Sequence, residues 1–280
     1  MTDTPSFADV PFTYDSQQRR SPAVEELLDI IRYRDLIYQL IRRDIVARYK
    51  RSVLGILWTM LQPLGIMLVL TIVFSNLFGG AKAYPAYLLS GLIAWTFFAQ
   101  TTTASIHQSV WGGALMRRIN VPYTVFSVSS VGTGVVNLIL SLVPLFLILL
   151  ITKKSITWAV LFLPIPLLFL TAFALGIGLM LSSLAVRFPD ISEMYQIIIQ
   201  AWMYITPIMY PATIIPESYR NWVLHLNPMY YLVSMFRMPI YEGSLPPFSI
   251  ILVGAAISLV TLTLGWIYFS HEADKFAYIA

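Results

Sequence analysis

Long apolar segments without a charged residue dominate the chain. Each is close to, or above, the length of about 20 residues that a helix needs to cross the roughly 30 Å hydrocarbon core of a bilayer. Lipid offers no hydrogen-bond partner to the backbone, so such segments form helices. The pattern predicts an all-α membrane protein with a transmembrane domain over residues 53–270. Its six transmembrane helices are expected near 53–78, 84–106, 124–151, 157–184, 194–213 and 248–270.

The residues before the first apolar segment have an amphipathic pattern. Ser21 and Pro22 are typical of a helix N-cap and first helical position, and apolar side chains then recur at helical spacing from Val24 to Ile31. The stretch 36–49 mixes apolar and basic positions, as in helices that lie on an anionic leaflet. We therefore expect a flexible cytoplasmic tail at 1–20 and cytoplasmic amphipathic interface helices over 21–52. Topogenic charge alone would also account for the basic residues.

A further uncharged stretch, 221–236, lies between the fifth and sixth predicted helices. Its 16 residues are too few to span a bilayer, and Asn227-Pro228 interrupts them. Irregular backbone is tolerated at membrane depth where it is buried in protein or lines a wet cavity. The stretch is predicted to be a re-entrant outer segment. An amphipathic helix on the surface of the outer leaflet is the alternative.

Lysine and arginine orient the predicted helices. Thirteen of the eighteen fall on the side that also holds both termini, nine of them before residue 53. The positive-inside rule then places both termini, including a tail at 271–280, in the cytoplasm. We expect a multi-pass protein of the inner (plasma) membrane. The first 20 residues contain no apolar core typical of a cleavable signal peptide.

Composition excludes several classes of function. The chain is 58% hydrophobic and 11% charged, with a mean hydropathy of +0.72, which is too apolar for a soluble domain. The net charge of +4 comes from basic residues beside apolar runs, where they meet anionic lipid head groups, so nucleic acid is not an expected partner. The absence of cysteine excludes disulfides and thiol catalysis, and three scattered histidines do not predict a metal site.

Catalytic chemistry is also missing from the sequence. The predicted helices contain no acidic residue for a proton relay or paired-carboxylate catalysis. No glycine is followed by lysine, so the chain has no P-loop and is not expected to hydrolyse ATP. We predict no enzymatic activity and no cofactor in this chain. If transport is ATP-driven, a partner protein binds the ATP and Mg²⁺.

Five segments together resemble the membrane subunit of type 2 ABC exporters, which move O-antigen, capsule or teichoic acid chains. The resemblance extends from about residue 30 to the C-terminus. The segments are RRDIVARYKRSVLGILWTMLQP (42–63), SGLIAWTFF (90–98), RRINVP (117–122), RFPDI (187–191) and LNPMYYLVSMFR (226–237).

The resemblance implies a homodimer that pairs with two ATP-binding cassette subunits and exports an undecaprenyl-diphosphate-linked polysaccharide, which we expect to be O-antigen. Arg48, Lys50 and Arg51 would meet the lipid diphosphate or anchor in lipid head groups. A coupling helix that docks on the ATPase would lie between the second and third transmembrane helices. Its candidate residues are Gly113, Leu115, Met116, Arg117, Arg118, Ile119, Asn120 and Pro122.

Aromatic and methionine side chains crowd the predicted helices. Aromatic faces stack on sugar rings, so these residues are candidates for a pore or gate, although ordinary packing or an interfacial belt would explain each one singly. The resemblance adds the region around Asn227 as an outer gate. The candidates are Trp58, Met60, Trp95, Phe98, Trp202, Met203, Tyr204, Asn227, Pro228, Tyr230 and Tyr231.

Two other functions fit the same pattern. One is a type 2 ABC exporter of lipids or drugs, which shares the six-helix plan. The other is a passive channel or scaffold without an ATPase, since clean transmembrane helices do not exclude it. The basic N-terminal segment and the aromatic helices favour the polysaccharide exporter.

Overall fold

The computed structural model describes residues 22–50, 52–75, 77, 84–111 and 121–279, and these residues form helices without any strand. The helices are α1 (Pro22–Arg32), α2 (Arg34–Tyr49), α3 (Leu57–Phe74), α4 (Tyr84–Trp111), α6 (Tyr123–Ile151), α7 (Pro164–Arg187), α8 (Ile191–Ile205), α9 (Glu217–His225), α10 (Pro228–Arg237) and α11 (Phe248–Ile279). Three short helical turns join them: η2 (Trp158–Phe162), η3 (Ala212–Ile214) and the π-helical η4 (Met238–Glu242).

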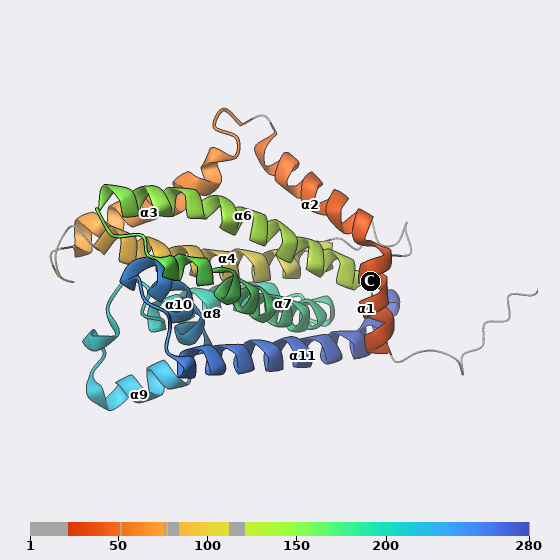
Figure 1. Ribbon diagram of the computed structural model, residues 1–280. Coiled ribbons are helices and arrows are strands. Elements are labelled where there is room, and N and C mark those ends of the chain that lie inside the picture. The colour runs from red at the N-terminus through yellow and green to blue at the C-terminus, as the bar shows by residue number, and fades with distance from the viewer. Residues whose placement is uncertain (1–21, 51, 76, 78–83, 112–120, 280) are drawn as a thin grey trace, which may run out of the picture.

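The long helices α3, α4, α6, α7 and α11 run along one direction and form a bundle (Figure 1). The amphipathic helix α1 lies across one end of the bundle, where α11 also ends. The helices α9 and α10 lie at the opposite end (Figure 1). Both ends of the described chain are therefore at the same end of the bundle.

Four helical segments have the length and apolar composition of a membrane span. They are Leu57–Phe74, Tyr123–Ile151, Trp158–Arg187 and Phe248–Glu272, and they match the first, third, fourth and sixth predicted segments. The prediction of an all-α protein with membrane-spanning helices is confirmed to that extent. Six transmembrane helices remain a prediction.

The second and fifth predicted segments are not among these four, for two different reasons: composition in one and length in the other. The helix α4 is 28 residues long, but its threonine, serine and glutamine side chains dilute its hydropathy. The helix α8 has only 15 residues and ends at Ile205, well before the predicted end at residue 213. Pro207 causes this early end, because a proline disfavours the helical conformation of the residue before it. Thr206 accordingly adopts an extended conformation with ψ of 130°.

The helix α4 is the centre of the bundle and packs against α3, α6, α7, α8 and α10. Its side chains from Leu88 to Ile106 supply much of the main hydrophobic core, and Leu89 and Phe98 are completely buried. Polar side chains of α4 are enclosed with them, including Thr102, which shares a 2.6 Å hydrogen bond with Tyr195 of α8. A helix of this composition is stable in the bundle because its neighbours shield it from lipid.

The helices α7 and α11 approach each other through glycine. A Cβ atom on Gly265 would lie 2.2 Å from the carbonyl oxygen of Gly176, and one on Gly176 would lie 2.5 Å from the Thr261 carbonyl. Small residues also join α7 to α4, where the Ser182 hydroxyl donates to the Ser105 carbonyl at 3.0 Å. Close backbone contact of this kind is the usual way in which membrane helices associate.

The N-terminal helices dock on the bundle end. The Trp266 indole of α11 donates to the Ala23 carbonyl of α1 at 3.0 Å, while Leu27 and Ile31 of α1 stay more than half exposed. The helix α2 packs on α6 through a small apolar cluster around Ile37 and Leu40, and then rises away from the bundle to meet α3 (Figure 1). The exposed apolar side chains of α1 fit the predicted interface helix.

The segment predicted to be re-entrant consists of α9, a turn at Asn227, and α10. The helix α9 exposes Tyr219 and Trp222, whereas α10 is buried against α4, α7 and α11 through residues such as Met229 and Phe236. A broken helical hairpin with one buried arm agrees with the predicted interruption at Asn227-Pro228. Its depth in a membrane remains a prediction.

We expect Gly265→Ala to lower the thermal stability of the purified protein. The added Cβ would meet a backbone carbonyl of α7, which cannot rotate away, so α7 and α11 would have to separate. Overpacking of this kind costs about 1–3 kcal/mol. The fraction of monodisperse protein that remains after heating in detergent measures the effect.

Gly65→Ala in α3 is the matched control, since nothing lies within 4 Å of its added Cβ. Alanine is favoured over glycine inside a helix, so its melting temperature should be unchanged or higher. Equal melting temperatures for the two variants would contradict the close packing of α7 and α11.

Candidate functional site

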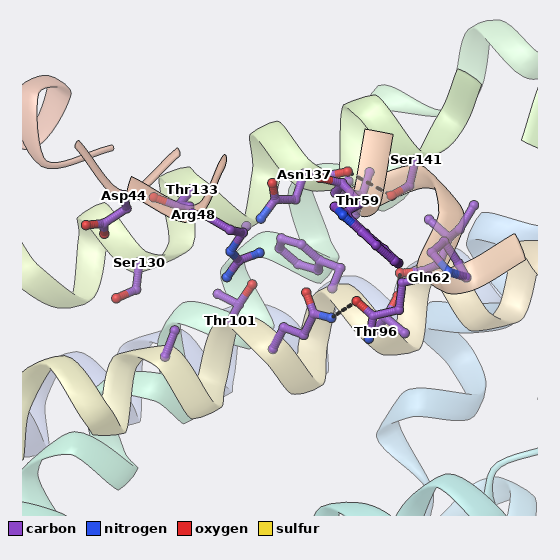
Figure 2. Close-up of a pocket in the computed structure, with 18 of the residues that line it drawn as sticks. Asp44, Arg48, Thr59, Gln62, Thr96, Thr101, Ser130, Thr133, Asn137 and Ser141 are labelled. Atoms are coloured by element: carbon purple, nitrogen blue, oxygen red, sulfur yellow. Dashed lines mark hydrogen bonds between the residues drawn. The ribbon is translucent and has the colours of Figure 1, made fainter. Parts of the chain in front are cut away.

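A cavity of about 320 Å³ lies between α2, α3, α4 and α6. Figure 2 shows that its labelled polar side chains come from all four helices. It adjoins the N-terminal part of α3, residues 93–108 of α4 and residues 130–141 in the middle of α6. The polar residues in its wall are Asp44, Arg48, Thr59, Gln62, Thr96, Gln100, Thr101, Gln108, Ser130, Thr133, Asn137 and Ser141.

Helical spacing brings these polar side chains together. In α4 the polar positions 96, 100, 101 and 108 lie on one face, and in α6 the positions 130, 133, 137 and 141 recur at intervals of three or four. Two polar stripes that face each other across a helix pair leave a polar cavity. Sequence reasoning missed this site because it searched the apolar segments for charges and passed over neutral polar side chains.

Hydrogen bonds within the wall leave part of its polar surface free for a ligand. The hydroxyls of Thr96 and Ser141 donate to backbone carbonyls of their own helices at 2.7 and 2.9 Å. The Gln100 amide approaches the Gln62 amide at 3.5 Å, a long and weak contact. Uncommitted amide groups remain available to exchange these contacts for a bound molecule.

Among the residues that the structure describes, Asp44 and Arg48 are the charged ones in the wall. The Asp44 carboxylate accepts hydrogen bonds from Gln108 at 2.8 Å and from Arg43 at 2.8 Å, so its charge is already compensated. Arg48 points from α2 into the cavity (Figure 2). Of the residues predicted to meet a lipid head group, Arg48 therefore lines the cavity and Lys50 is exposed just beyond the end of α2. Arg51 lies outside the described residues.

The pore and gate candidates separate into exposed and buried groups. Trp58 lines the cavity and is 55% exposed, Tyr204 of α8 is 56% exposed, and Met60 of α3 is partly buried. Trp95 and Phe98 are buried within the subunit.

The buried candidates form one aromatic cluster. Trp202 meets the rings of Trp95 and Phe98 edge-on, with centroids 6.0 and 5.4 Å apart, and Phe98 stacks on Phe173 at 5.3 Å. Met203 packs against the same core. Such contacts hold α4, α7 and α8 together, so these side chains support the walls of the bundle.

Asn227 organises the end of the bundle away from the cavity. Its side-chain oxygen accepts from the Trp202 indole at 2.9 Å and from the Met229 backbone at 3.1 Å, which caps α10. Its amide nitrogen donates to the Thr206 hydroxyl at 2.9 Å. Pro228 fits the first position of α10, where no donor is needed.

The remaining two gate candidates lie next to this cap. The rings of Tyr230 and Tyr231 meet edge-on at 5.4 Å, and the Tyr231 hydroxyl shares a 3.1 Å hydrogen bond with a ring nitrogen of His225. They connect the first turn of α10 to α9.

Arg237 is a buried cation that the sequence placed among exposed charges. Its guanidinium donates to the carbonyls of Pro207 and Ile208 at 3.0 and 3.2 Å, and it lies 3.9 Å above the Tyr87 ring. Gly91 makes room for it, since a Cβ there would lie 2.1 Å from the guanidinium. Arg237 thus binds the non-helical residues that follow α8 to α4 and α10. In the sequence, Arg237 stands at the end of an apolar run, where a charged residue commonly marks the point at which a chain leaves the membrane. No other feature of the sequence pointed to its burial.

Most of the predicted coupling residues lie outside the described part of the chain: Gly113, Leu115, Met116, Arg117, Arg118, Ile119 and Asn120. Pro122 is described and precedes α6 directly, in an extended conformation with ψ of 137°. The predicted coupling helix would therefore join α4 to α6 at the bundle end that carries α1 (Figure 1).

We expect Arg237→Lys to destabilise the protein by about 1–3 kcal/mol, because an ammonium group cannot bind two carbonyls as the planar guanidinium does and leaves a buried acceptor unpaired. The melting temperature of the purified protein should fall accordingly.

Arg220→Lys provides the comparison. Arg220 also donates to two carbonyls, those of Thr213 and Ile215 at 3.0 Å each, but its side chain is 33% exposed, so water can replace the lost bond. Its melting temperature should hardly change. A fall as large as that of Arg237→Lys would show that burial of Arg237 does not govern the effect.

Comparison with known proteins identifies relatives over most of the chain. Residues 35–241 match the family described as "ABC-2 type transporter". The O-antigen export system permease protein RfbA of Myxococcus xanthus is 32% identical over 260 residues, which cover 89% of this chain and 96% of the relative. A protein of the same name from Klebsiella pneumoniae is 25% identical over 75% of this chain and 82% of the relative. The polysialic acid transport protein KpsM of Escherichia coli is 24% identical over 80% of this chain and 88% of the relative.

Proposed function

Because this chain belongs to the ABC-2 type transporter family, we propose that it is the permease subunit of an ATP-driven exporter that carries a lipid-linked polysaccharide, O-antigen, across the inner membrane. The similarity to an O-antigen export permease along nearly the whole of both chains is the observation that carries this proposal. The family disfavours a passive channel or scaffold, and the names of the three relatives described above favour glycans over drugs. The lipid carrier is proposed to be undecaprenyl diphosphate.

A separate pair of ATP-binding cassette subunits supplies the energy in this proposal. The segment with Arg117 and Arg118 docks on them, and movement passes through Pro122 into α6. Because α4 ends and α6 begins on either side of this segment, a shift there reaches both polar walls of the cavity.

A second copy of the chain completes the conduit in this proposal. The helices α3 and α8 each bury only two residues: Pro63 and Met67 in α3, and Tyr195 and Ile199 in α8. Their exposed side chains, which include Trp58 and Tyr204, are free to face the partner and to line the conduit between the subunits. Asn227 and the tyrosines of α10 form the gate at the far end. The buried aromatic cluster keeps the wall rigid.

Arg48 and Lys50 are proposed to receive the diphosphate of the lipid carrier. Both are exposed at the end of α2, where Arg48 also lines the cavity, and Arg51 follows in the sequence. Cations near a low-dielectric interface attract phosphate more strongly than they do in bulk water. Both termini and the cavity mouth would then face the cytoplasm, where the carrier is loaded.

We expect the tagged protein, purified from its host membrane in mild detergent, to carry a stoichiometric ATPase with a P-loop. Replacement of Arg117 and Arg118 by glutamate should release that ATPase, because the changes invert the charge of the proposed docking segment. Mass spectrometry of the purified complex measures both. Recovery of the intact protein without any ATPase, when a known ABC complex survives the same treatment, would contradict the proposal.

We expect the double change Arg48→Ala and Lys50→Ala to reduce the amount of polysaccharide at the cell surface about tenfold, since each 1.4 kcal/mol of lost binding is a factor of ten. Lipid-linked polysaccharide should accumulate inside the cell. Immunoblots of surface and total polysaccharide measure the two pools. Arg34→Ala, at the exposed start of the same helix, is the control and should export normally. Equal export by both variants would contradict the proposed binding of the lipid head group by Arg48 and Lys50.

A further inference from the structure

We propose that the cavity between α2, α3, α4 and α6 binds an uncharged sugar residue of the lipid-linked glycan, directly next to the diphosphate. The inference rests on the function proposed above and assigns the sugar and the phosphate to different places. The cavity takes the sugar, and the cations at its mouth take the phosphate.

The wall of the cavity matches a sugar in its hydrogen-bonding groups. Gln62, Gln100 and Asn137 each offer one acceptor and two donor hydrogens, and the threonine and serine hydroxyls can do either. A sugar presents hydroxyls that also donate and accept. Trp58 adds an aromatic face at the edge of the cavity, of the kind that stacks on a sugar ring.

Two buried polar atoms in this wall have no partner. The side-chain oxygen of Asn137 and the hydroxyl of Thr101 make no hydrogen bond, although Asn137 is only 9% exposed and Thr101 only 1%. An unpaired buried polar group costs about 1–3 kcal/mol. Both side chains lie near Arg48 in Figure 2, on the wall that α4 and α6 form. Both atoms are shielded from the cavity, and the Thr101 hydroxyl packs against Gly134, so a bound hydroxyl could reach either atom only after the side chain rotates toward it.

Charge argues that the phosphate itself stays outside. The Asp44 carboxylate stands in the wall beside Gln108 and is paired with Arg43, and Arg48 is the other charged group among the described residues that line the cavity. A buried diphosphate would need several cations to offset the cost of its desolvation. Burial of a neutral sugar does not require the removal of water from a charged group. Arg48 lies at the boundary, lining the cavity and two residues from Lys50, so it can hold the phosphate while the sugar enters.

The volume of the cavity is large enough for one part of a glycan. The volume of about 320 Å³ is at the lower end of the range of roughly 300–1,000 Å³ for small-molecule sites. The cavity therefore suits recognition of the sugar at the lipid-linked end and cannot hold the polymer. Export would then depend on the identity of that first sugar and much less on the repeat unit.

Gln100→Met tests the site without removing a strong structural bond. The variant replaces an exposed amide that makes only a 3.5 Å contact with Gln62 and keeps a side chain of similar length, so the melting temperature should not fall, while surface polysaccharide should drop about tenfold if a ligand bond of typical strength is lost. Thr263→Val on the exposed side of α11 is the control and should export normally. Its hydroxyl bonds the Leu259 carbonyl, away from the cavity.

Three outcomes are distinguishable. Normal export by Gln100→Met, in a host where deletion of the gene abolishes surface polysaccharide, overturns the sugar site and leaves the proposed function intact. Unchanged surface polysaccharide after deletion overturns the proposed function and the sugar site with it. Reduced export at unchanged stability supports both.

A second measurement uses the absence of cysteine from the chain. Ala104→Cys places one thiol in the cavity wall, and Thr213→Cys places one on the exposed turn η3 near α9. In the reconstituted complex, lipid-linked glycan extracted from the host should slow maleimide labelling of Ala104→Cys at least about threefold, and undecaprenyl diphosphate without sugar should not. Thr213→Cys should label equally in every sample. Equal protection by the two lipids, or by neither, would overturn the assignment of the cavity to a sugar.

Discussion

The enclosure of α4 is the constraint on which the rest of the structure depends. This helix carries neutral polar side chains along most of its length, and lipid would offer their hydroxyl and amide groups no hydrogen-bond partners. Five helices therefore surround it. Its buried aromatic side chains pack against Trp202 and Phe173. Its polar side chains face α6 and line the cavity. The first turn of α4 binds the non-helical residues that follow α8, because the Tyr84 hydroxyl donates to the Met209 carbonyl at 2.6 Å.

The two proposed working regions follow each other along this one helix. The cavity adjoins α4 from Ile93 to Gln108, toward the end that leads to the predicted coupling segment. Tyr84, Tyr87 and Gly91 in its first half hold the residues after α8 and the buried Arg237. In the proposed mechanism α4 is a direct physical link between the cytoplasmic loading site and the outer gate. The proposed mechanism requires such a link, since an opened conduit must close again to prevent ion leak.

Much of this fold could be predicted from the sequence, because long uncharged segments and amphipathic spacing have few alternatives in a membrane. The break at Asn227-Pro228 was also visible, since the proline marks it. Pro207 ends the fifth helix at Ile205, so the end predicted at residue 213 from the apolar pattern alone is too late. Arg237 shows a deeper limit. Whether an arginine at the end of an apolar run faces water or two backbone carbonyls depends on tertiary neighbours such as Gly91, which lies far away in the sequence. The polar cavity depends likewise on the rotation of α4 against α6.

The central claim is that this chain moves a lipid-linked polysaccharide outward when a partner ATPase hydrolyses ATP. The most direct measurement places the purified complex in liposomes with host lipid-linked glycan on the ATPase side and follows the appearance of glycan on the other side. The account predicts transfer that needs ATP and stops when the ATPase is inactivated. Transfer that proceeds equally without ATP, or ATP hydrolysis without any glycan transfer in liposomes that retain the complex, would contradict it.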